Sequence, residues 1–263
     1  MTPAIRLGGS TWGFFRGDDA SVWGSQSEAI RRMVEADLGV EVWPTRGRDD
    51  PDPSRGEIAR MQDACSDAPF VSVHMRGRFW RWDPASFRAE IEFAAGLGAS
   101  TLVIHPICLG LRLSTDRPDM EAIRRLAGFA AKRDVRIALE NVVDSAWALD
   151  RVLENLGDDP AATNFGVCLD IGHAFLSEDV GPNPIRRYAE RYVDALIHLH
   201  LHDNSGVEDD HRPVGEGRID WGNVCRVLKE IGFGGTGVCE VQSDFGGSAL
   251  RAIEERMLRL NLR

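Results

Sequence analysis

Eight short apolar runs alternate with amphipathic stretches along the chain, and this alternation is the feature that most restricts the fold. The runs are AIRLGGS (4–10), LGVEVWP (38–44), FVSVHMR (70–76), STLVIHP (100–106), VRIALEN (135–141), FGVCLDI (165–171), ALIHLHLHD (195–203) and GVCEV (237–241). Between them lie stretches such as 28–37, 84–98, 120–134, 147–157 and 221–232, whose apolar residues recur three or four positions apart, as in helices. Strands that alternate with helices pair in parallel through crossover connections.

Eight such units within 263 residues predict an α/β protein with the (β/α)8 TIM barrel fold, formed by one domain over residues 1–263. An open doubly wound sheet usually carries a glycine-rich phosphate-binding turn after its first strand, and GGSTWG lacks the GxGxxG spacing. The segments PTRGRDDPDP, SEDVGPNP and DNSGVEDDHRPVGEG are rich in turn residues and are interpreted as loops.

Composition narrows the class of protein. Apolar residues make up 43% of the chain, no run approaches the length of a membrane helix, and MTPAIRLGGS does not resemble a signal peptide. The five cysteines are widely spaced without a CxxC pair, which favours buried thiols in a reducing cytoplasm. With no run of membrane-helix length, a membrane is not an expected partner. With 41 acidic and 31 basic side chains the formal charge is −10, so nucleic acid is not an expected partner either.

Ionisable side chains close six consecutive apolar runs. In a barrel of parallel strands these ends meet at one mouth, where TIM-barrel active sites lie. A single histidine at a strand end is usually hydrogen-bonded without a metal, but an unpaired buried carboxylate costs several kcal/mol and is normally paired or bound to an ion. The coincidence therefore predicts a metal site. The residues concerned are His74, His105, Glu140, Asp170 with His173 just beyond it, His200 with His202, and Glu240.

The run HLHLHDN places three histidines at alternate positions. Strand periodicity sends His198, His200 and His202 to the barrel interior and Leu199 and Leu201 to the helices outside. Because same-face positions lie about 7 Å apart, one ion cannot bind all three. Either His200 or His202 is expected to be a ligand, and His198, the deepest, to be a core residue or one that orients a ligand.

Asp209 and His211 in the following loop extend the candidate set. Imidazole and carboxylate ligands without thiolate suit Zn²⁺, Mn²⁺, Fe²⁺ or Co²⁺. The set exceeds the needs of one ion, so one to three ions per chain are expected, and a bridging carboxylate such as Glu140 can hold two about 3.5–4 Å apart. The candidate ligands are His74, His105, Glu140, Asp170, His173, His200, Asp209, His211 and Glu240.

Glu140 and Glu240 are the candidate catalytic residues, because the fifth and eighth runs place them across the barrel mouth from each other. One carboxylate can remove a proton next to a carbonyl while an ion stabilises the enediolate and the other carboxylate returns the proton, which is isomerase or epimerase chemistry. The same ligands with a metal-bound hydroxide attacking phosphorus would be hydrolytic. A lyase or an oxidation on the same scaffold is a further alternative.

Aromatic and basic residues follow the first three runs on the side where a substrate would enter. Apolar sugar faces stack on such rings, although tryptophans at a barrel rim also pack against helices or mediate contacts in a homo-oligomer. Arginines in the loop RGRFWRW can meet a phosphate or carboxylate. The candidate substrate-binding residues are Trp12, Trp43, His202 and Arg76, with Arg78, Phe79, Trp80, Arg81 and Trp82 in the same loop.

The strand ends ALEN, CLDIGH, HLHDN and CEV, together with HRPVGEGRIDW, resemble the xylose isomerase-like TIM barrel superfamily. This superfamily contains sugar phosphate isomerases and epimerases and also the related apurinic endonuclease family. In its ketose epimerase branch the resemblance implies one divalent ion held by Glu140, Asp170, His200 and Glu240, with the two glutamates acting as acid and base. His173 would bind substrate there.

The apurinic endonucleases carry a trinuclear site, and the resemblance extends to all its ligand types. It implies His74, His105 and Glu140 around one ion, Asp170, His200 and Glu240 with the shared Glu140 around a second, and His173, Asp209 and His211 around a third. The acidic chain and its short loops, poor in basic residues, depart from a DNA-binding enzyme. The sequence therefore predicts a metal-dependent isomerase or epimerase of a small sugar-like molecule in carbohydrate metabolism.

Overall fold

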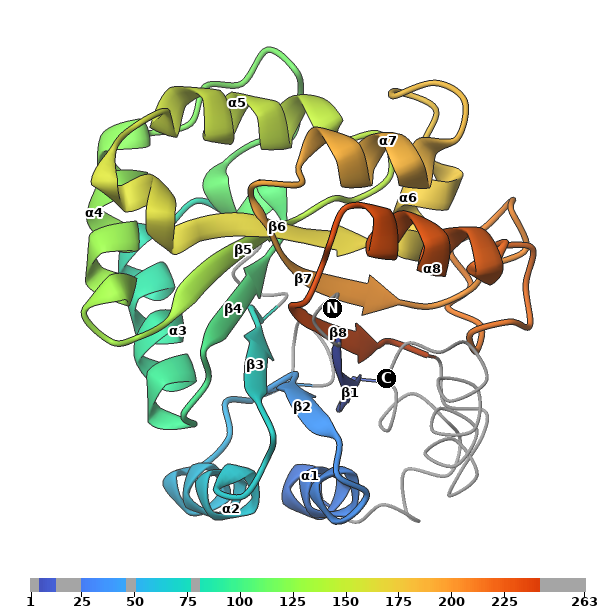
Figure 1. Ribbon diagram of the computed structural model, residues 1–263. Helices are drawn as coiled ribbons and strands as arrows, with labels where there is room; N and C mark the ends of the chain where they lie inside the picture. The colour runs from blue at the N-terminus through green and yellow to red at the C-terminus, as the bar shows by residue number, and fades with distance from the viewer. Residues whose placement is uncertain (1–4, 13–24, 46–50, 77–80, 242–263) are drawn as a thin grey trace.

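Eight parallel strands close into a barrel in the computed structural model, which describes residues 5–12, 25–45, 51–76 and 81–241 (Figure 1). Each strand pairs with the next along the chain, and β8 pairs with β1 to complete the circle. The predicted (β/α)8 TIM barrel is confirmed. The strands are β1 (Arg6–Ser10), β2 (Gly39–Val42), β3 (Val71–His74), β4 (Thr101–Ile104), β5 (Arg136–Glu140), β6 (Phe165–Asp170), β7 (Leu196–Leu201) and β8 (Thr236–Cys239).

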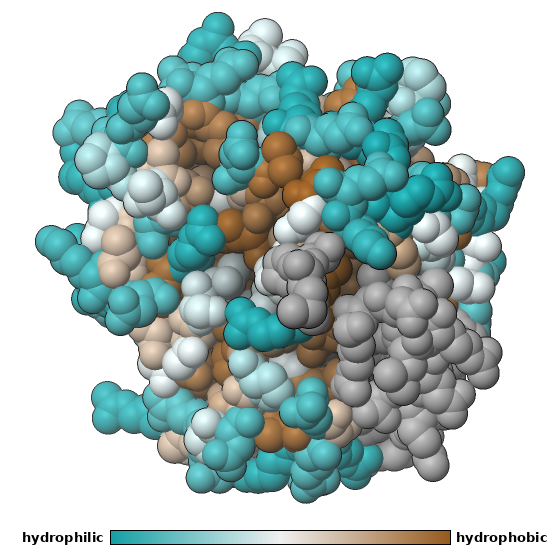
Figure 2. Space-filling model, viewed as in Figure 1, coloured by the Kyte–Doolittle hydropathy of each residue, from teal (hydrophilic) through white to brown (hydrophobic). Residues whose placement is uncertain are grey.

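Helices connect the strands on the outside of the barrel (Figure 1). They are α1 (Gln26–Glu35), α2 (Arg55–Cys65), α3 (Pro84–Gly96), α4 (Met120–Ala131), α5 (Ala146–Leu156), α6 (Ile171–Leu176), α7 (Pro184–Arg191) and α8 (Trp221–Glu230), with 3₁₀ turns η3 (Pro106–Leu109) and η4 (Pro160–Asn164). On the face seen in Figure 2, hydrophilic side chains cover the helical layer and apolar ones show between them. Within the described ranges, no helix is both long and apolar enough to cross a membrane.

Local sequence signals explain where several helices begin. The Ser25 side chain accepts a hydrogen bond from the backbone of Glu28 and so caps α1. Ser54 and Glu57 form a reciprocal capping box at the start of α2. Asp83 caps α3, whose first residue is a proline with a backbone angle already suited to a helix.

The barrel wall separates an apolar outside from a polar inside at its carboxyl end. Leu199 and Leu201 join the core between strands and helices, as the alternation in β7 predicted. Val103, Ala138 and Cys168 form a smaller apolar cluster of their own. All five cysteines are free thiols, and only Cys225 is not fully buried, which confirms the predicted absence of a disulfide framework.

Candidate metal centre

Six of the seven histidines gather at the carboxyl end of the barrel, and His198 lies deeper, level with the first residue of β8. Neighbouring imidazole rings lie between 3.8 and 6.0 Å apart, from His105 and His74 through His200 to His198, and separately among His173, His202 and His211. Every one except His105 is buried. Carboxylates lie between these rings, and all of them except Asp209 are buried.

Glu140, the last residue of β5, lies at the centre of the cluster. Its Oε2 is 3.2 Å from Nε2 of both His74 and His105, while its Oε1 is 3.3 Å from Nδ1 of His173 and 3.4 Å from Nδ1 of His200. Burial raises the pKa of the Glu140 carboxyl, but the facing imidazoles of His200 and His105 outweigh it and bring the pKa well below its usual value. Glu140 thus belongs to candidate ligand groups with His74 and His105 and with Asp170 and His173.

His200 faces three carboxylates through one nitrogen. Its Nδ1 is 3.4 Å from an oxygen of Glu140, 3.4 Å from an oxygen of Glu240 and 3.8 Å from an oxygen of Asp170. The side chain is fully buried, yet its Nδ1 makes no hydrogen bond. Buried polar atoms are almost always hydrogen-bonded, so an unbonded imidazole nitrogen among three carboxylates fits the donor set of a divalent ion.

The two candidate catalytic carboxyls have different electrostatic environments. Burial raises the pKa of Glu240, and the nearby carboxylates of Glu41 and Glu140 raise it further against the opposing effect of His200. The pKa of Glu140 is lowered instead. Two carboxyls whose environments separate their pKa values are suited to different proton-transfer roles.

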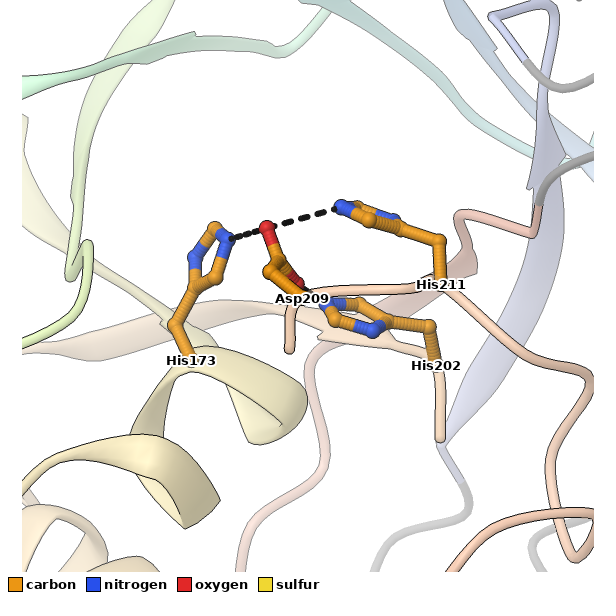
Figure 3. A group of neighbouring side chains, drawn as sticks. All are labelled: His173, His202, Asp209 and His211. Atoms are coloured by element: carbon orange, nitrogen blue, oxygen red, sulfur yellow. Dashed lines mark hydrogen bonds and ion pairs between the residues drawn. The ribbon is translucent and has the colours of Figure 1, made fainter. Parts of the chain in front are cut away.

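A second group lies towards the loop after β7 (Figure 3). Oδ2 of Asp209 is 3.0 Å from Nε2 of His173 and 3.3 Å from Nε2 of His211, and its Oδ1 is 3.8 Å from Nε2 of His202. Each of the four side chains offers a ligand atom within 4.8 Å of those of the others, so together they could hold a divalent ion. His202 also lies 3.0 Å from Oδ1 of Asp170, so it stands between the two groups.

Backbone carbonyls orient three of the imidazoles. His74, His173 and His211 each place Nδ1 at 2.9 to 3.1 Å from a main-chain oxygen. An imidazole that donates from Nδ1 in this way presents Nε2 as the free lone pair, which is how metal-binding histidines are usually held. The acceptors are the carbonyls of Met75, Asn141 and Glu240, respectively.

Asp203 fixes the loop that carries Asp209 and His211. Its wholly buried carboxylate accepts hydrogen bonds from the backbone of Gly215 and Ile219, at 3.0 and 3.1 Å, and from the Trp221 indole at 2.8 Å. A Cβ atom on Gly217 would collide with this carboxylate. The second glycine of GEGRIDW therefore allows the loop to close around Asp203.

His211 has a backbone φ of +41°, in the left-handed region that residues with a Cβ rarely adopt. Strained backbone of this kind persists where the surroundings hold it, and it is most common at functional sites. In this conformation Nε2 of His211 lies 3.3 Å from Oδ2 of Asp209.

Glu41 is a member of the cluster that sequence reasoning missed. It is wholly buried in β2, with Oε1 3.1 Å from Nε2 of His200 and Oε2 3.2 Å from Nε2 of His198. His198 occupies the deep position predicted for it, where its Nδ1 also contacts Thr236 Oγ1 at 2.6 Å. The signal was present, since a lone carboxylate in the apolar run LGVEVWP is the pattern that singled out Glu140.

Trp12 and Trp43 lie against the cluster. Trp43 stacks on His74 with ring centres 3.8 Å apart, and its Nε1 donates a hydrogen bond to Glu240 at 3.0 Å. Trp12 is 4.7 Å from the His211 ring and 6.0 Å from that of Trp43. Both predicted substrate-binding tryptophans are therefore beside the predicted ligands.

The charged group of Arg76 pairs with acids outside the histidine cluster. Its guanidinium pairs with the buried Glu90 of α3, with Nε 2.7 Å from Oε1, and also with Asp52. Trp82 packs on Phe87, with ring centres 6.4 Å apart. The structure thus brings neither side chain into the histidine cluster by any contact it describes. Arg78, Phe79 and Trp80 lie outside the described residues.

A cavity of about 380 Å³ opens beside His105. Its walls come from the segments that follow β4 and β5, and they include Leu111, Val142 and Trp147, with Arg112 among the polar residues. Since His105 lies 3.2 Å from Glu140, the cavity adjoins the carboxylate at the centre of the cluster.

Comparison with known sequences identifies a family. The family described as xylose isomerase-like TIM barrel matches residues 36–260. The uncharacterized protein ML2432 of Mycobacterium leprae is 28% identical over 286 residues, which cover 97% of this chain and 94% of that protein. MJ1311 of Methanocaldococcus jannaschii is 29% identical over 182 residues, and MJ1614 of the same organism 26% over 155; these alignments cover 64% and 55% of this chain but only 60% and 56% of those proteins.

Solved structures share the fold over nearly the whole chain. TTHB071 of Thermus thermophilus, solved after soaking with ZnCl₂, is 25% identical with a TM-score of 0.65, over 96% of this chain and 97% of its own. A D-tagatose 3-epimerase-like protein is 20% identical with a TM-score of 0.70, over 98% of both chains. The 3-keto-D-glucoside 4-epimerase YcjR of E. coli is 16% identical with a TM-score of 0.65, over 98% and 100%.

Proposed function

The chain belongs to the xylose isomerase-like TIM barrel family, and on this premise we propose that it is a divalent-metal-dependent isomerase or epimerase of a sugar or sugar-derived small molecule. The observation that carries the proposal is the pair of buried carboxyls, Glu140 and Glu240, on either side of the unbonded Nδ1 of His200. The two glutamates and His200 can bind a metal ion together, and the glutamates can also transfer protons.

Glu140, Asp170, His200 and Glu240 are the residues proposed to hold the ion, which from the donor set is Zn²⁺, Mn²⁺, Fe²⁺ or Co²⁺. The fit rests on the buried imidazole nitrogen that lacks a hydrogen bond and on the three carboxylates facing it. A bound divalent ion would stabilise the negative charge that develops on the substrate when a proton leaves the carbon next to its carbonyl.

The two glutamates have separate proposed roles. One of them removes the proton from the carbon next to the carbonyl and the other returns a proton to the substrate; both lie 3.4 Å from Nδ1 of His200. In the reverse reaction the roles exchange. Trp43 keeps Glu240 oriented through the hydrogen bond from its indole.

The surroundings suit a small substrate with an apolar face. Trp12 and Trp43 provide rings on which a sugar can stack next to the carboxyls. The cavity beside His105 offers room for the remainder of the molecule.

Hydrogen exchange at carbon tests this function. The metal-supplemented protein is incubated in D₂O with ketoses and ketose phosphates, and we expect solvent deuterium to enter one substrate carbon. Glu140→Gln and Glu240→Gln should each abolish the exchange, whereas Glu121→Gln, on the exposed face of α4, should leave it unchanged. Full activity in Glu240→Gln would refute the two-carboxylate mechanism.

A multinuclear phosphoesterase is the second candidate. It is favoured by two further ligand groups beyond the one just described: His74 and His105 with Glu140, and the four side chains of Figure 3. Elemental analysis of protein purified without chelator separates the two functions. Two or three equivalents of ion together with cleavage of abasic-site DNA or a simple phosphodiester would establish hydrolysis, and one equivalent with carbon exchange would establish the epimerase.

A further inference from the structure

Glu41 is a wholly buried acid that the proposed mechanism does not use. Along β2 it pairs in register with Ser72 of β3, two residues before His74, so it lies about one layer deeper in the barrel than the ring of predicted ligands. Its Oε2 accepts a hydrogen bond from Ser72 Oγ at 2.9 Å and lies 3.2 Å from His198 Nε2. That oxygen is therefore engaged away from the metal-binding cluster.

The other oxygen of Glu41 contacts the far side of His200. Oε1 is 3.1 Å from Nε2 of His200, while Nδ1 of the same ring faces Glu140 and Glu240 at 3.4 Å each. The imidazole thus spans from a deep carboxylate to the cluster above it. In this arrangement a proton on Nε2 is attracted to Glu41, and the lone pair is left on Nδ1.

We propose that Glu41 is a positioning residue that holds His200 with Nε2 protonated and Nδ1 directed into the cluster as a metal ligand. The inference rests on the proposed metal-dependent function. An anionic partner behind a histidine fixes its tautomer and ring angle and strengthens it as a donor, and loss of such a partner typically weakens metal binding 10- to 100-fold. Glu41 itself acts through His200, without touching the substrate.

Metal affinity provides a test that does not depend on turnover. Zn²⁺ affinity is measured by chelator competition on metal-free wild type, Glu41→Gln and Glu41→Leu. Gln keeps an oxygen towards Nε2 and loses the charge, so Glu41→Gln should bind Zn²⁺ about 10- to 100-fold more weakly, and Glu41→Leu more weakly still.

Glu90→Gln is the matched control. Glu90 of α3 is also a wholly buried glutamate, but it pairs with Arg76 and contacts none of the histidines in any way the structure describes. It should lose stability while Zn²⁺ affinity remains that of wild type. If Glu41→Gln weakens Zn²⁺ binding no more than Glu90→Gln does, the inference is overturned while the proposed function stands.

A measurement on the unaltered protein covers the case in which the Glu41 variants do not fold. NMR of ¹⁵N-histidine-labelled protein loaded with Zn²⁺ reports the tautomer of each imidazole, and His200 should carry its proton on Nε2. A proton on Nδ1 would overturn the inference alone. A wild-type protein that binds no divalent ion would overturn both the inference and the metal-dependent function.

Discussion

The indole of Trp43 donates a hydrogen bond to Oε1 of Glu240 at 3.0 Å, which links a residue of the segment after β2 to one beyond β8. Trp43→Phe keeps an aromatic ring over His74 and removes only the donor. Without this donor Glu240 is held less firmly, so kcat should fall about tenfold. The lost hydrogen bond to a buried carboxyl should also lower the free energy of unfolding by about 1 to 2 kcal/mol. Steady-state kinetics on the substrate found by deuterium exchange measures the change.

Trp82→Phe is the control for that substitution, since Trp82 packs on Phe87 rather than on Glu240. Its kcat should equal that of wild type. An equal loss of kcat in both variants would mean that the Trp43 hydrogen bond has no specific part in the reaction.

We propose that position 172 must be glycine to leave room for the His202 ring. A Cβ atom at position 172 would collide with the His202 ring, which lies 3.0 Å from Asp170. Gly172→Ala should therefore displace the ring and cost about 1 to 3 kcal/mol of stability, as overpacking does. Because the displaced His202 no longer supports Asp170 or faces Asp209, metal content should fall as well; denaturant melts and elemental analysis measure the two effects.

Replacement of another helical glycine separates these effects from those of adding a methyl group to any helix. Gly128→Ala, within α4, adds a Cβ that meets nothing within 4 Å, and its stability and metal content should match or exceed those of wild type. Undiminished metal content in Gly172→Ala would show that the position of His202 does not matter for the ions.

The barrel was predictable because the same pattern, an apolar run followed by an amphipathic stretch, recurs along the sequence. Each apolar run fits a strand on its own, and parallel pairing then brings all the carboxyl ends to one mouth, so Glu140, Asp170 and His200 converge without any knowledge of distances. The helix α2 shows the opposite case. Its sequence pattern is weak, and the capping box of Ser54 and Glu57 was the signal available for it.

Residues whose partners lie far away in the chain were less predictable. Arg76 follows β3 as a substrate-binding residue would, but its partner Glu90 is fourteen positions on, and nothing in the sequence distinguishes that acid from other charges of α3. Strand periodicity leaves open whether His200 or His202 binds an ion, and it only makes His202 a candidate for substrate binding. The contacts of His202 with Asp170 and Asp209 depend on the fold of the loop after β7.

Protons compete with metal ions at this site, so its pH dependence is predictable. In the metal-free protein burial opposes protonation, but the facing carboxylates raise the pKa of His173, His200 and His211 above the usual 6.5. A raised folded-state pKa contributes stability that is fully present below about pH 6.5 and is lost as the pH rises through the folded value. The metal-free protein should therefore become less stable above neutral pH.

The metal-free protein should also become less stable in acid. The pKa values of Glu140 and Asp170 are lowered, and stability from a lowered pKa is lost as the pH falls through the folded-state value. Zn²⁺ requires deprotonated imidazoles, so the rise in melting temperature on adding Zn²⁺ should grow between about pH 6 and pH 8. Melts at several pH values with Zn²⁺ or with chelator measure it. A rise that is constant over this range would contradict the participation of these histidines.

Removal of one partner of the Arg76–Glu90 pair tests whether Arg76 binds substrate or supports the fold. The guanidinium also lies over the Phe93 ring, 5.3 Å from its centre, and Glu90 is wholly buried. Because Arg76→Met leaves this carboxylate without its cation, it should cost about 3 to 5 kcal/mol of unfolding free energy, while KM and metal content stay unchanged. The double variant Arg76→Met with Glu90→Leu removes both charges and should recover most of the loss. A large rise in KM with stability intact would instead assign Arg76 to the substrate, as the sequence first suggested.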